Sequence, residues 1–374
     1  MSRSWFKSKR KRMVLIVMLA IIMTLSCILP GRMNTSYAAS KSAIRNEVKK
    51  VTVSGRSFNV RTVSIPKGVP TTVGLAKGKV GLTQDFNAIV KTYRAEAAIN
   101  GAFFEAYGGP PDPYGNLIVD GKIAHMGHYG TTIGFKSDGT ALMDSLRLSL
   151  SGKVSRTVGS PIGWYATFIN RTPLANANVS ILYTEERGSR VGFKGGIAVV
   201  IENGKVTYKG PNDNVIIPKE GYVLICNGTE KSMAERFEVG ADVEMSVTYK
   251  DDKGQALPWE EVITAVGAGP RLVKDGKVSV TPAAEGFKDQ KILSSAAARS
   301  GIAIMADGSV MLATVSGATM KQWAEVMHKM GAKQAMNLDG GASSALYSGG
   351  KVLTPAGRLL SNTLIFGSNL NRNP

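Results

Sequence analysis

The chain has 374 residues, a formal net charge of +18, three histidines and two cysteines. The few histidines and cysteines show no metal-ligand spacing, which argues against a zinc enzyme. The basic residues are dispersed and form no arm or aromatic-interleaved patch, so no nucleic-acid partner is predicted.

Residues 1–38 have the pattern of a secretory signal peptide. A basic start precedes an apolar run over 13–29, and the small residues Ser36 and Ala38 stand before the expected cut. We therefore expect the mature protein to be secreted or extracytoplasmic. The alternative is a single membrane anchor, because a run of this length is borderline for spanning a bilayer. A membrane partner is expected only through this leader, if it stays uncleaved.

The chain after the leader is still strongly basic. Removing residues 1–38 takes away seven basic residues and no acidic one, which leaves a formal charge of +11. A chain this basic is expected to associate with anionic partners. For a secreted protein, cell-wall polymers or phosphorylated glycans fit better than nucleic acid, so association with the cell wall is an expectation. Only Cys226 remains, so no internal disulfide is expected.

The first segment after the leader, residues 39–82, is predicted to be a separate N-terminal β region. Residues 57–65, SFNVRTVSI, alternate between apolar and polar side chains as a half-buried strand does. Pro66 and Pro70 interrupt the pattern after this run. The remaining residues, 83–374, form the main predicted domain.

Strand-like runs separated by short turns recur through this domain. Asp120-Gly121, Asn203-Gly204 and Asp275-Gly276 each stand between apolar runs. Asn-Gly and Asp-Gly favour type I′ hairpin turns, because both central residues need a positive φ. The predicted fold class is therefore α+β, with a β-rich core of hairpins and mixed sheet and a few flanking helices. Residues 170–250 are interpreted as a β-rich insertion in this domain.

Two helices are expected to lead into the functional region. Thr83 is the predicted cap of the first helix. The second helix begins at Thr319, which forms a capping box with Gln322 ahead of apolar residues at helical spacing. A short apolar strand follows each helix, at 97–99 and 335–338, and runs into a loop rich in Asn and Gly. Two equivalent helix–strand–loop units therefore predict that two polar loops meet at one place.

The second loop, NLDGGASSAL, combines a carboxylate with glycines and hydroxyl groups. Gly340 and Gly341 let a ligand approach the backbone, and successive N–H groups in such a turn can bind an anion. Ser343 and Ser344 add hydroxyl donors, and a helix that begins there would add positive potential. Together these groups suit a phosphate or a sugar hydroxyl beside Asp339. The alternative is that Asp339 only caps the next helix.

The first loop, residues 100–122, has Asn100 and Glu105 as its polar candidates near the strand end. Its aromatic side chains fit a sugar-stacking face or the core, and they are Phe103, Phe104 and Tyr107. The glycines and prolines of this loop are typical of a rigid binding loop. Asp112 is expected to be a turn residue.

Two arginines are candidates for binding a phosphate. Arg271 follows Gly269-Pro270, and Arg299 begins an apolar strand. A guanidinium group is well shaped for bidentate phosphate recognition and keeps its charge. The alternative for Arg299 is an ion pair with a core carboxylate. His125 and His128 are expected at turns or on the surface.

No cofactor and no metal site are predicted. A bound divalent cation stays open, because Asp and Asn cluster around these loops, but no ligand set with a recognisable spacing supports one. A serine hydrolase is disfavoured, since the chain lacks G-x-S-x-G and Ser343 has no obvious histidine partner.

The ordered set of motifs resembles the phosphodiester glycosidases, which are related to the mammalian uncovering enzyme, an N-acetylglucosamine-1-phosphodiester alpha-N-acetylglucosaminidase. The resemblance rests on INGAFF with Glu105, GAGPRLV, ARSGIAI with DGSVMLATV, and NLDGGASSAL with SNTLIFG. It spans roughly residues 95–367. Ala102 and Ala342 stand where the family usually has glycine, so either these positions have ordinary dihedrals or the loops differ locally.

The resemblance implies a hydrolase that cleaves the sugar C1–O bond of a sugar-1-phosphodiester. It would release an N-acetylglucosamine-like sugar and leave a phosphomonoester, so the substrate would be a sugar-phosphate or a glycan. Such a reaction needs a carboxylate near C1, and here also positive charge around the phosphate. Asp339 and Glu105 are the candidate carboxylate pair, and neither is assigned as acid, base or nucleophile.

The remaining candidates would bind the substrate. Arg271 and Arg299 would hold the phosphate, together with the backbone N–H groups and hydroxyls of residues 341–344. Asn100 would orient a sugar hydroxyl or an acetamido group. Two other interpretations stay open: a non-catalytic protein that binds anionic cell-wall or exopolysaccharide polymer, and a phosphodiesterase that cuts the P–O bond.

Overall fold

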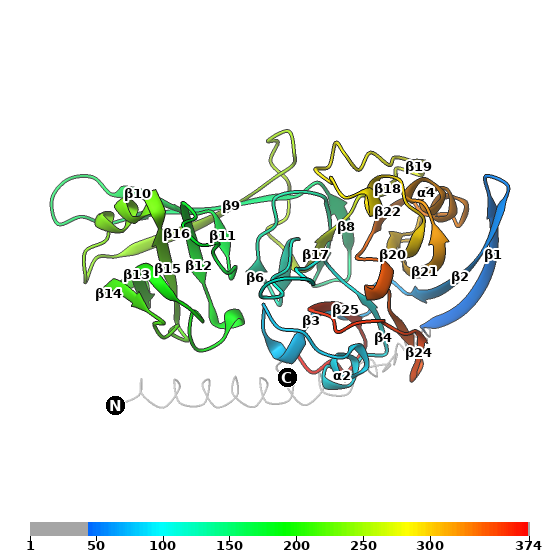
Figure 1. Cartoon of the computed structure of the whole chain (residues 1–374), viewed down its shortest axis with the longest axis horizontal. Coiled ribbons are helices and arrows are strands. Elements are labelled where there is room, and N and C mark those ends of the chain that lie inside the picture. The colour runs from blue at the N-terminus through cyan, green and yellow to red at the C-terminus, as the bar shows by residue number, and fades with distance from the viewer. Residues whose placement is uncertain (1–43, 373–374) are drawn as a thin grey trace, which may run out of the picture. The chain divides into compact units, whose positions relative to one another are not determined.

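A computed structural model describes residues 44–372 of the chain (Figure 1). These residues belong to one compact unit. The predicted signal peptide lies outside the described residues. Between residues 44 and 372, no helix is long and apolar enough to cross a membrane.

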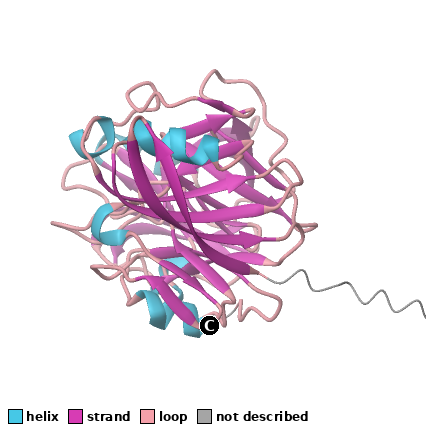
Figure 2. Ribbon diagram, turned by 90° about the vertical axis from the view of Figure 1, so that its right-hand side faces the viewer, coloured by secondary structure: helices cyan, strands magenta, loops and turns pink. Residues whose placement is uncertain are grey.

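Strands dominate the described chain, and its few helices lie at the outside of the sheets (Figure 2). The predicted β-rich core with few helices is therefore confirmed. The strand pairs are antiparallel, except that β11 (Phe168–Ile169) pairs in parallel with β12 (Val179–Tyr183). Among the described residues, this short pair is the only parallel one, and the β11–β12 sheet is therefore the only mixed sheet.

The largest sheet has seven strands and is called the β20 sheet. Its order is β1 (Arg45–Val53), β2 (Arg56–Ile65), β21 (Val310–Ala318), β20 (Ala297–Ile304), β22 (Gln334–Asn337), β18 (Arg271–Lys274) and β19 (Lys277–Val278). Strands β20 and β22 are neighbours, and Gly301 lies opposite Asn337. The residues that follow β22 therefore emerge beside the beginning of β20.

Two five-stranded sheets pack near it. The β4 sheet has the order β24 (Lys351–Thr354), β23 (Leu346–Ser348), β4 (Ala97–Asn100), β25 (Asn362–Phe366) and β3 (Thr71–Leu75). The β17 sheet has the order β6 (Lys122–His125), β5 (Leu117–Val119), β17 (Val262–Ala268), β7 (Thr131–Lys136) and β8 (Ala141–Asp144). One core cluster takes side chains from all three sheets, among them Ile302, Ile99 and Ile133.

The other two sheets come from the middle of the chain (Figure 1). The β15 sheet has the order β11, β12, β15 (Gly221–Asn227), β13 (Lys194–Glu202) and β14 (Lys205–Asp213). The β9 sheet has the order β10 (Ile162–Ala166), β9 (Arg147–Val154) and β16 (Val243–Lys250). A second core cluster joins these strands, with Trp164, Leu224 and Phe237 among its buried side chains.

The predicted helices form, with one change at a start. Helix α4 (Met320–Lys329) begins at the predicted capping box of Thr319 and Gln322. Helix α2 (Phe86–Thr92) is capped by Asp85, which accepts a hydrogen bond from the backbone of Ala88, so the prediction of Thr83 as its cap is wrong. Besides these, the described chain has α3 (Gln290–Leu293) and the 3₁₀ segments η2 (Ala76–Gly78), η3 (Glu185–Arg187), η4 (Gly228–Arg236) and η5 (Gly341–Ser343).

The predicted hairpin turns are confirmed at all three Asx-Gly pairs. Asp120 and Gly121 have φ of 47° and 82°, Asn203 and Gly204 have 50° and 74°, and Asp275 and Gly276 have 50° and 71°. Both central residues are left-handed, as a type I′ turn requires.

Strand pairing crosses the boundaries predicted from the sequence. In the segment 39–82, β2 pairs with β21 and β3 pairs with β25, so its strands complete two sheets of the main domain. In the segment 170–250, β16 pairs with β9, which precedes that segment. The division into domains stays a prediction.

Candidate functional site

The two predicted loops meet, and Asn100 joins them. Its side-chain Nδ2 donates to the backbone carbonyl of Asp339 at 2.6 Å, and its Oδ1 accepts from the backbone N–H of Ala345 at 2.9 Å. The backbone N–H of Asp339 also donates to the carbonyl of Gly101 at 3.1 Å. Asn100 is buried, so its amide fixes the two loops and is not placed to bind a sugar.

A cavity of about 740 Å³ lies over these loops. The carboxylates that line it are Glu105, Asp289 and Asp339. The cationic side chains that line it are Lys288, Lys291, Arg299 and Arg358. The aromatic side chains that line it are Phe103, Phe104, Tyr107, Tyr114, Tyr129 and Phe287. Both carboxylates proposed from the sequence therefore share one cavity with cations and aromatic rings.

Asp339 holds a half-buried carboxylate at the end of β22. Burial raises its pKa to about 6, because the charged form loses contact with water. Three weaker influences lower the pKa: a hydrogen bond with the Ser343 side chain, the backbone N–H of Gly340 at 2.8 Å, and the charge of Arg358. The carboxyl group can therefore gain and lose a proton near neutral pH.

Glu105 has the opposite environment. Its Oε1 accepts hydrogen bonds from the backbone of Tyr107 at 2.9 Å and of Gly108 at 3.2 Å, and its Oε2 accepts from the Tyr114 hydroxyl at 2.7 Å. These donors lower the pKa of Glu105, the Tyr107 N–H most of all. Two carboxyl groups with pKa values moved apart commonly take different parts in acid–base chemistry.

Arg299 is a buried cation on β20, with 1% of its surface exposed. Its Nε donates to the carbonyl of Ala318 at 3.0 Å, and its Nη2 donates to those of Lys291 at 2.8 Å and Ser295 at 2.5 Å. No carboxylate of residues 44–372 forms a salt bridge with it, so the alternative of a core ion pair is wrong. Burial lowers the pKa of this guanidinium, and a neighbouring anion would compensate that cost.

Arg271 lies outside the cavity. It stands on β18, its Nη2 donates to the carbonyl of Met143 at 2.8 Å, and its backbone N–H donates to Glu285 at 2.7 Å. The hydrogen bond to Met143 places the guanidinium at β8, and Arg271 is not among the residues that line the cavity. The structure therefore does not bring Arg271 to the predicted phosphate site.

The glycines and serines after Asp339 divide between the cavity and the core. A Cβ on Gly340 would stand 2.8 Å from the carbonyl of Ala298, so Gly340 lets this loop pass close to β20. Gly341 has a φ of 59° and also lines the cavity, as does Ser343. Ser344 is buried and is not among the lining residues.

Two expectations for this turn are resolved. The three-residue 3₁₀ segment η5 follows this turn, with Gly340 at its cap position and no side-chain cap, so the alternative that Asp339 caps a helix is wrong. Ala342 and Ala102 do not have positive φ, which shows that these alanines adopt ordinary dihedrals.

Arg358 is a site residue that the sequence motifs do not reveal. It lies between β24 and β25, and the backbone N–H of its neighbour Gly357 donates to the carbonyl of Ala342 at 2.7 Å. Its Nη2 donates to the hydroxyl of Tyr107 at 2.9 Å, and its guanidinium lies 5.0 Å from the centre of that ring. Only a Pro-Ala-Gly turn before Arg358 marks it in the sequence, which is too common a pattern to single it out.

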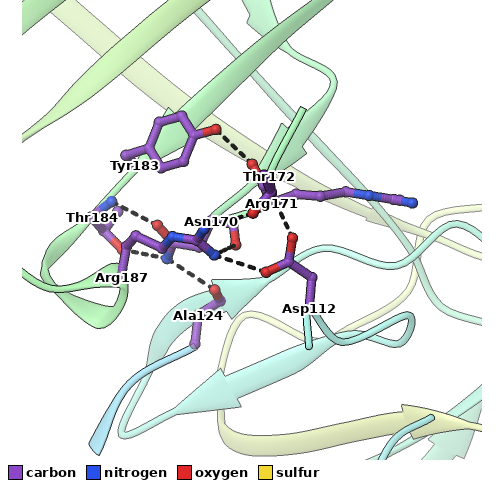
Figure 3. A network of polar contacts seen from close by, with 8 residues as sticks. All are labelled: Asp112, Ala124, Asn170, Arg171, Thr172, Tyr183, Thr184 and Arg187. Atoms are coloured by element: carbon purple, nitrogen blue, oxygen red, sulfur yellow. Dashed lines mark hydrogen bonds and ion pairs between the residues drawn. The ribbon is translucent and has the colours of Figure 1, made fainter. Parts of the chain in front are cut away.

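The loop that carries Glu105 is anchored by a buried ion pair (Figure 3). Asp112 accepts from Arg187 at 2.8 Å and from the backbone N–H of Thr172 at 2.6 Å, while Arg187 also donates to the Thr172 hydroxyl at 2.7 Å. The backbone N–H of Glu105 donates to the carbonyl of Asp112 at 3.0 Å. The expectation that Asp112 is only a turn residue is wrong, because its carboxylate joins this loop to the segment before β12.

The two histidines near this loop differ. His128 is exposed, as expected. His125 is fully buried, its Nδ1 lies 2.9 Å from the carbonyl of Gly115, and burial lowers its pKa to about 4. The prediction of a turn or surface position is therefore wrong for His125. Across residues 44–372, no three side chains of His, Cys, Asp or Glu come together in a group that could hold a metal ion.

Solved structures share this fold. A hypothetical protein from Synechocystis matches with a TM-score of 0.73 and 24% identity over 86% of this chain, which spans 62% of that protein's length. A candidate exported protein from Burkholderia pseudomallei matches with a TM-score of 0.66 and 21% identity, over 83% of this chain and 74% of that one. The catalytic domain of zebrafish N-acetylglucosamine-1-phosphodiester alpha-N-acetylglucosaminidase aligns with a TM-score of 0.48 and 12% identity, over 88% and 85% of the two chains. No curated protein matches the sequence.

The sequence itself matches a family of glycosidases over residues 195–366. This is the phosphodiester glycosidase family, and the predicted resemblance to it is confirmed over these residues. The stretch contains Arg299, Asp339 and Arg358. Glu105 and Asn100 lie before it, and Asn100 is joined to it by the hydrogen bonds described above.

Proposed function

We propose that this protein is a glycoside hydrolase that cleaves the C1–O bond of a sugar-1-phosphodiester, releasing the sugar and leaving a phosphomonoester. The observation that carries the proposal is the cavity that places Asp339 and Glu105 beside Arg299 and Arg358. The match of residues 195–366 to the phosphodiester glycosidase family supports the class of reaction.

The phosphate of the substrate lies between Arg299 and Arg358 in this proposal. Arg299 is already held by three carbonyl groups, so its guanidinium is oriented before a ligand arrives. Arg358 acts on the same region, because its charge lowers the pKa of Asp339. Preorganised positive charge stabilises the negative charge that develops on the departing phosphate.

Asp339 acts as the general acid and Glu105 stays ionised. When the C1–O bond breaks, the departing phosphomonoester takes up a second negative charge, and the pKa for its protonation is about 6. The pKa of Asp339 is also about 6, so donor and acceptor are matched for proton transfer. The ionised Glu105 then stabilises the positive charge that develops at C1. A water molecule adds to C1 and loses a proton, which balances the proton that Asp339 gave to the phosphate.

The test is a screen of the purified chain against UDP-sugars and sugar-1-phosphodiesters, with free reducing sugar as the readout. Hydrolysis in ¹⁸O-labelled water then distinguishes the bond that breaks. Label on the C1 hydroxyl supports a glycosidase, and label in the phosphate means that a phosphodiesterase cuts the P–O bond instead. Tight, salt-sensitive binding of anionic polymer without any sugar release would support the non-catalytic alternative.

The proposal also places the protein outside the cytoplasm. The leader pattern of residues 1–38 and the formal charge of +11 that remains after it support a secreted protein that meets anionic polymer at the cell wall. One structural relative is a candidate exported protein. N-acetylglucosamine is the first sugar to test, and immunodetection of the chain in culture medium and wall fractions tests its location.

A further inference from the structure

Three cationic side chains line the more exposed part of the cavity and lack acidic partners. Lys288 and Lys291 are exposed and Arg358 is half-buried. Among the salt bridges of residues 44–372, none involves these three side chains. The nearby Asp289 caps the start of α3, where its carboxylate accepts a hydrogen bond from the backbone N–H of Lys291 at 2.8 Å. Positive charge is therefore available here to a ligand.

Two of these cations converge on one exposed aromatic ring. The Nζ of Lys291 lies 5.7 Å from the centre of the Tyr107 ring, and the guanidinium of Arg358 lies 5.0 Å from it. Tyr107 is 78% exposed, so the ring contributes a platform at the mouth of the cavity. Lys291 and Arg358 carry like charges and form no salt bridge with a carboxylate of the described residues, so they repel each other, and an anion bound between them reduces that repulsion.

We propose that Lys288, Lys291 and the Tyr107 platform form a subsite for a second phosphate, carried by the leaving group of the substrate. This inference rests on the proposed function and deepens it: the substrate is a sugar joined through its 1-phosphate to a chain of further phosphodiesters. Arg358 lies at the junction, because it contacts Tyr107 and also influences Asp339. The cavity of about 740 Å³ is in the upper half of the range of about 300–1,000 Å³ typical for ligand sites, which leaves room beyond one sugar and one phosphate.

The first experiment measures binding and needs no turnover. Isothermal titration of the purified chain compares glycerol 1-phosphate with a synthetic trimer of glycerol phosphate. The trimer should bind more tightly, and the double variant Lys288→Gln/Lys291→Gln should weaken its binding by about 3- to 10-fold. Raised ionic strength should reduce this difference. Lys321→Gln, which removes one lysine charge from an exposed position on α4, is the control and should leave trimer binding unchanged.

The second experiment uses two substrates with the same sugar, a sugar-1-phosphoglycerol and its derivative with a terminal phosphate on the glycerol. The wild-type chain should show the higher kcat/KM for the derivative, and the double variant should lower that preference by the same factor of about 3 to 10. Equal binding of trimer and monophosphate, or equal loss in Lys321→Gln, overturns the subsite. If the binding results hold but no sugar is released from either substrate, the proposed hydrolysis fails while the anion subsite stands.

Discussion

Asp339 and Arg299 line the same cavity and reach it from neighbouring strands, since Asp339 follows β22 and Arg299 lies near the start of β20. Leu338, the residue before Asp339, donates its backbone N–H to the carbonyl of Ser300 at 2.9 Å. The pairing of β20 with β22 thus sets the position of Asp339, the proposed acid, relative to Arg299, which is proposed to bind the phosphate.

Removing the acid function should stop the reaction. Asp339→Asn keeps the shape of the side chain and its hydrogen-bonding oxygen but cannot donate the carboxyl proton. We expect kcat to fall by about 10²–10⁴-fold, measured as sugar released from the best diester of the screen. Asp307→Asn, in an exposed turn, is the control and should retain activity. Near wild-type turnover in Asp339→Asn would refute the assignment.

The same variant should be more stable than the wild type at neutral pH. The pKa of Asp339 is about 6 in the folded chain against 3.8 as the ordinary value, so the folded state holds a proton that the unfolded state has lost. The cost of ionising the carboxyl group is complete above about pH 6 and vanishes below about pH 4. We expect Asp339→Asn to raise the free energy of unfolding by about 1–3 kcal/mol near pH 7.5, after allowance for partial exposure. Urea denaturation near pH 3.5, where the carboxyl group is protonated in both states, should show no gain.

Replacing Arg299 by lysine should be severe. A lysine ammonium cannot reach the carbonyls of Ala318, Lys291 and Ser295 in the geometry that the planar guanidinium uses. We expect Arg299→Lys to lower the affinity for diesters by about tenfold or more and the free energy of unfolding by about 1–3 kcal/mol. Arg271→Lys, outside the cavity, should lower stability without changing the KM for diesters. The same KM effect in both variants would remove Arg299 from the binding site.

The low pKa of Glu105 should depend on Tyr114. The hydroxyl of Tyr114 donates to Oε2 of Glu105 at 2.7 Å and lowers the pKa of that carboxyl group. Tyr114→Phe removes this donor, so the pKa should rise and the acidic limb of the kcat/KM profile should move to higher pH. Tyr129→Phe also changes a cavity tyrosine, but Tyr129 has no hydrogen bond to Glu105 among the described contacts, so its acidic limb should stay in place.

Breaking the Asp112–Arg187 pair should destabilise the chain strongly. Both side chains are largely buried, and Arg187→Ala would leave the Asp112 carboxylate without its cation. We expect a loss of about 3–5 kcal/mol in the free energy of unfolding. Lys122→Gln removes an exposed partner of Glu185 and should cost at most about 1 kcal/mol. A loss in Arg187→Ala as small as that of the control would show that the pair does not anchor the Glu105 loop.

Local chemistry is sufficient to predict the parts of the site that depend on neighbours in the chain. The capping box at Thr319 and the Asx-Gly turns follow from side-chain and backbone preferences within a few residues. The meeting of the loops at Asn100 and Asp339 is also predictable, because two similar helix–strand–loop units end in similar positions.

Contacts between distant segments are the part that local patterns do not predict. Arg271 and Arg299 each stand near the start of a strand, but only Arg299 lines the cavity. Arg358 contacts Tyr107 across 251 positions of the chain, and no local pattern encodes that contact. The sequence around His125 and Asp112 indicates turns, yet both side chains are buried, and Asp112 accepts a hydrogen bond from Thr172, 60 positions further along the chain.

The amide of Asn100 has a broader consequence. A single side chain, anchored on the β4 sheet, holds the backbone on both sides of the short turn that follows the β20 sheet. Small shifts between those sheets would carry both loops along together instead of opening a gap between them. The carboxylates of Asp339 and Glu105, one on each loop, would thereby keep their spacing while the sheets move.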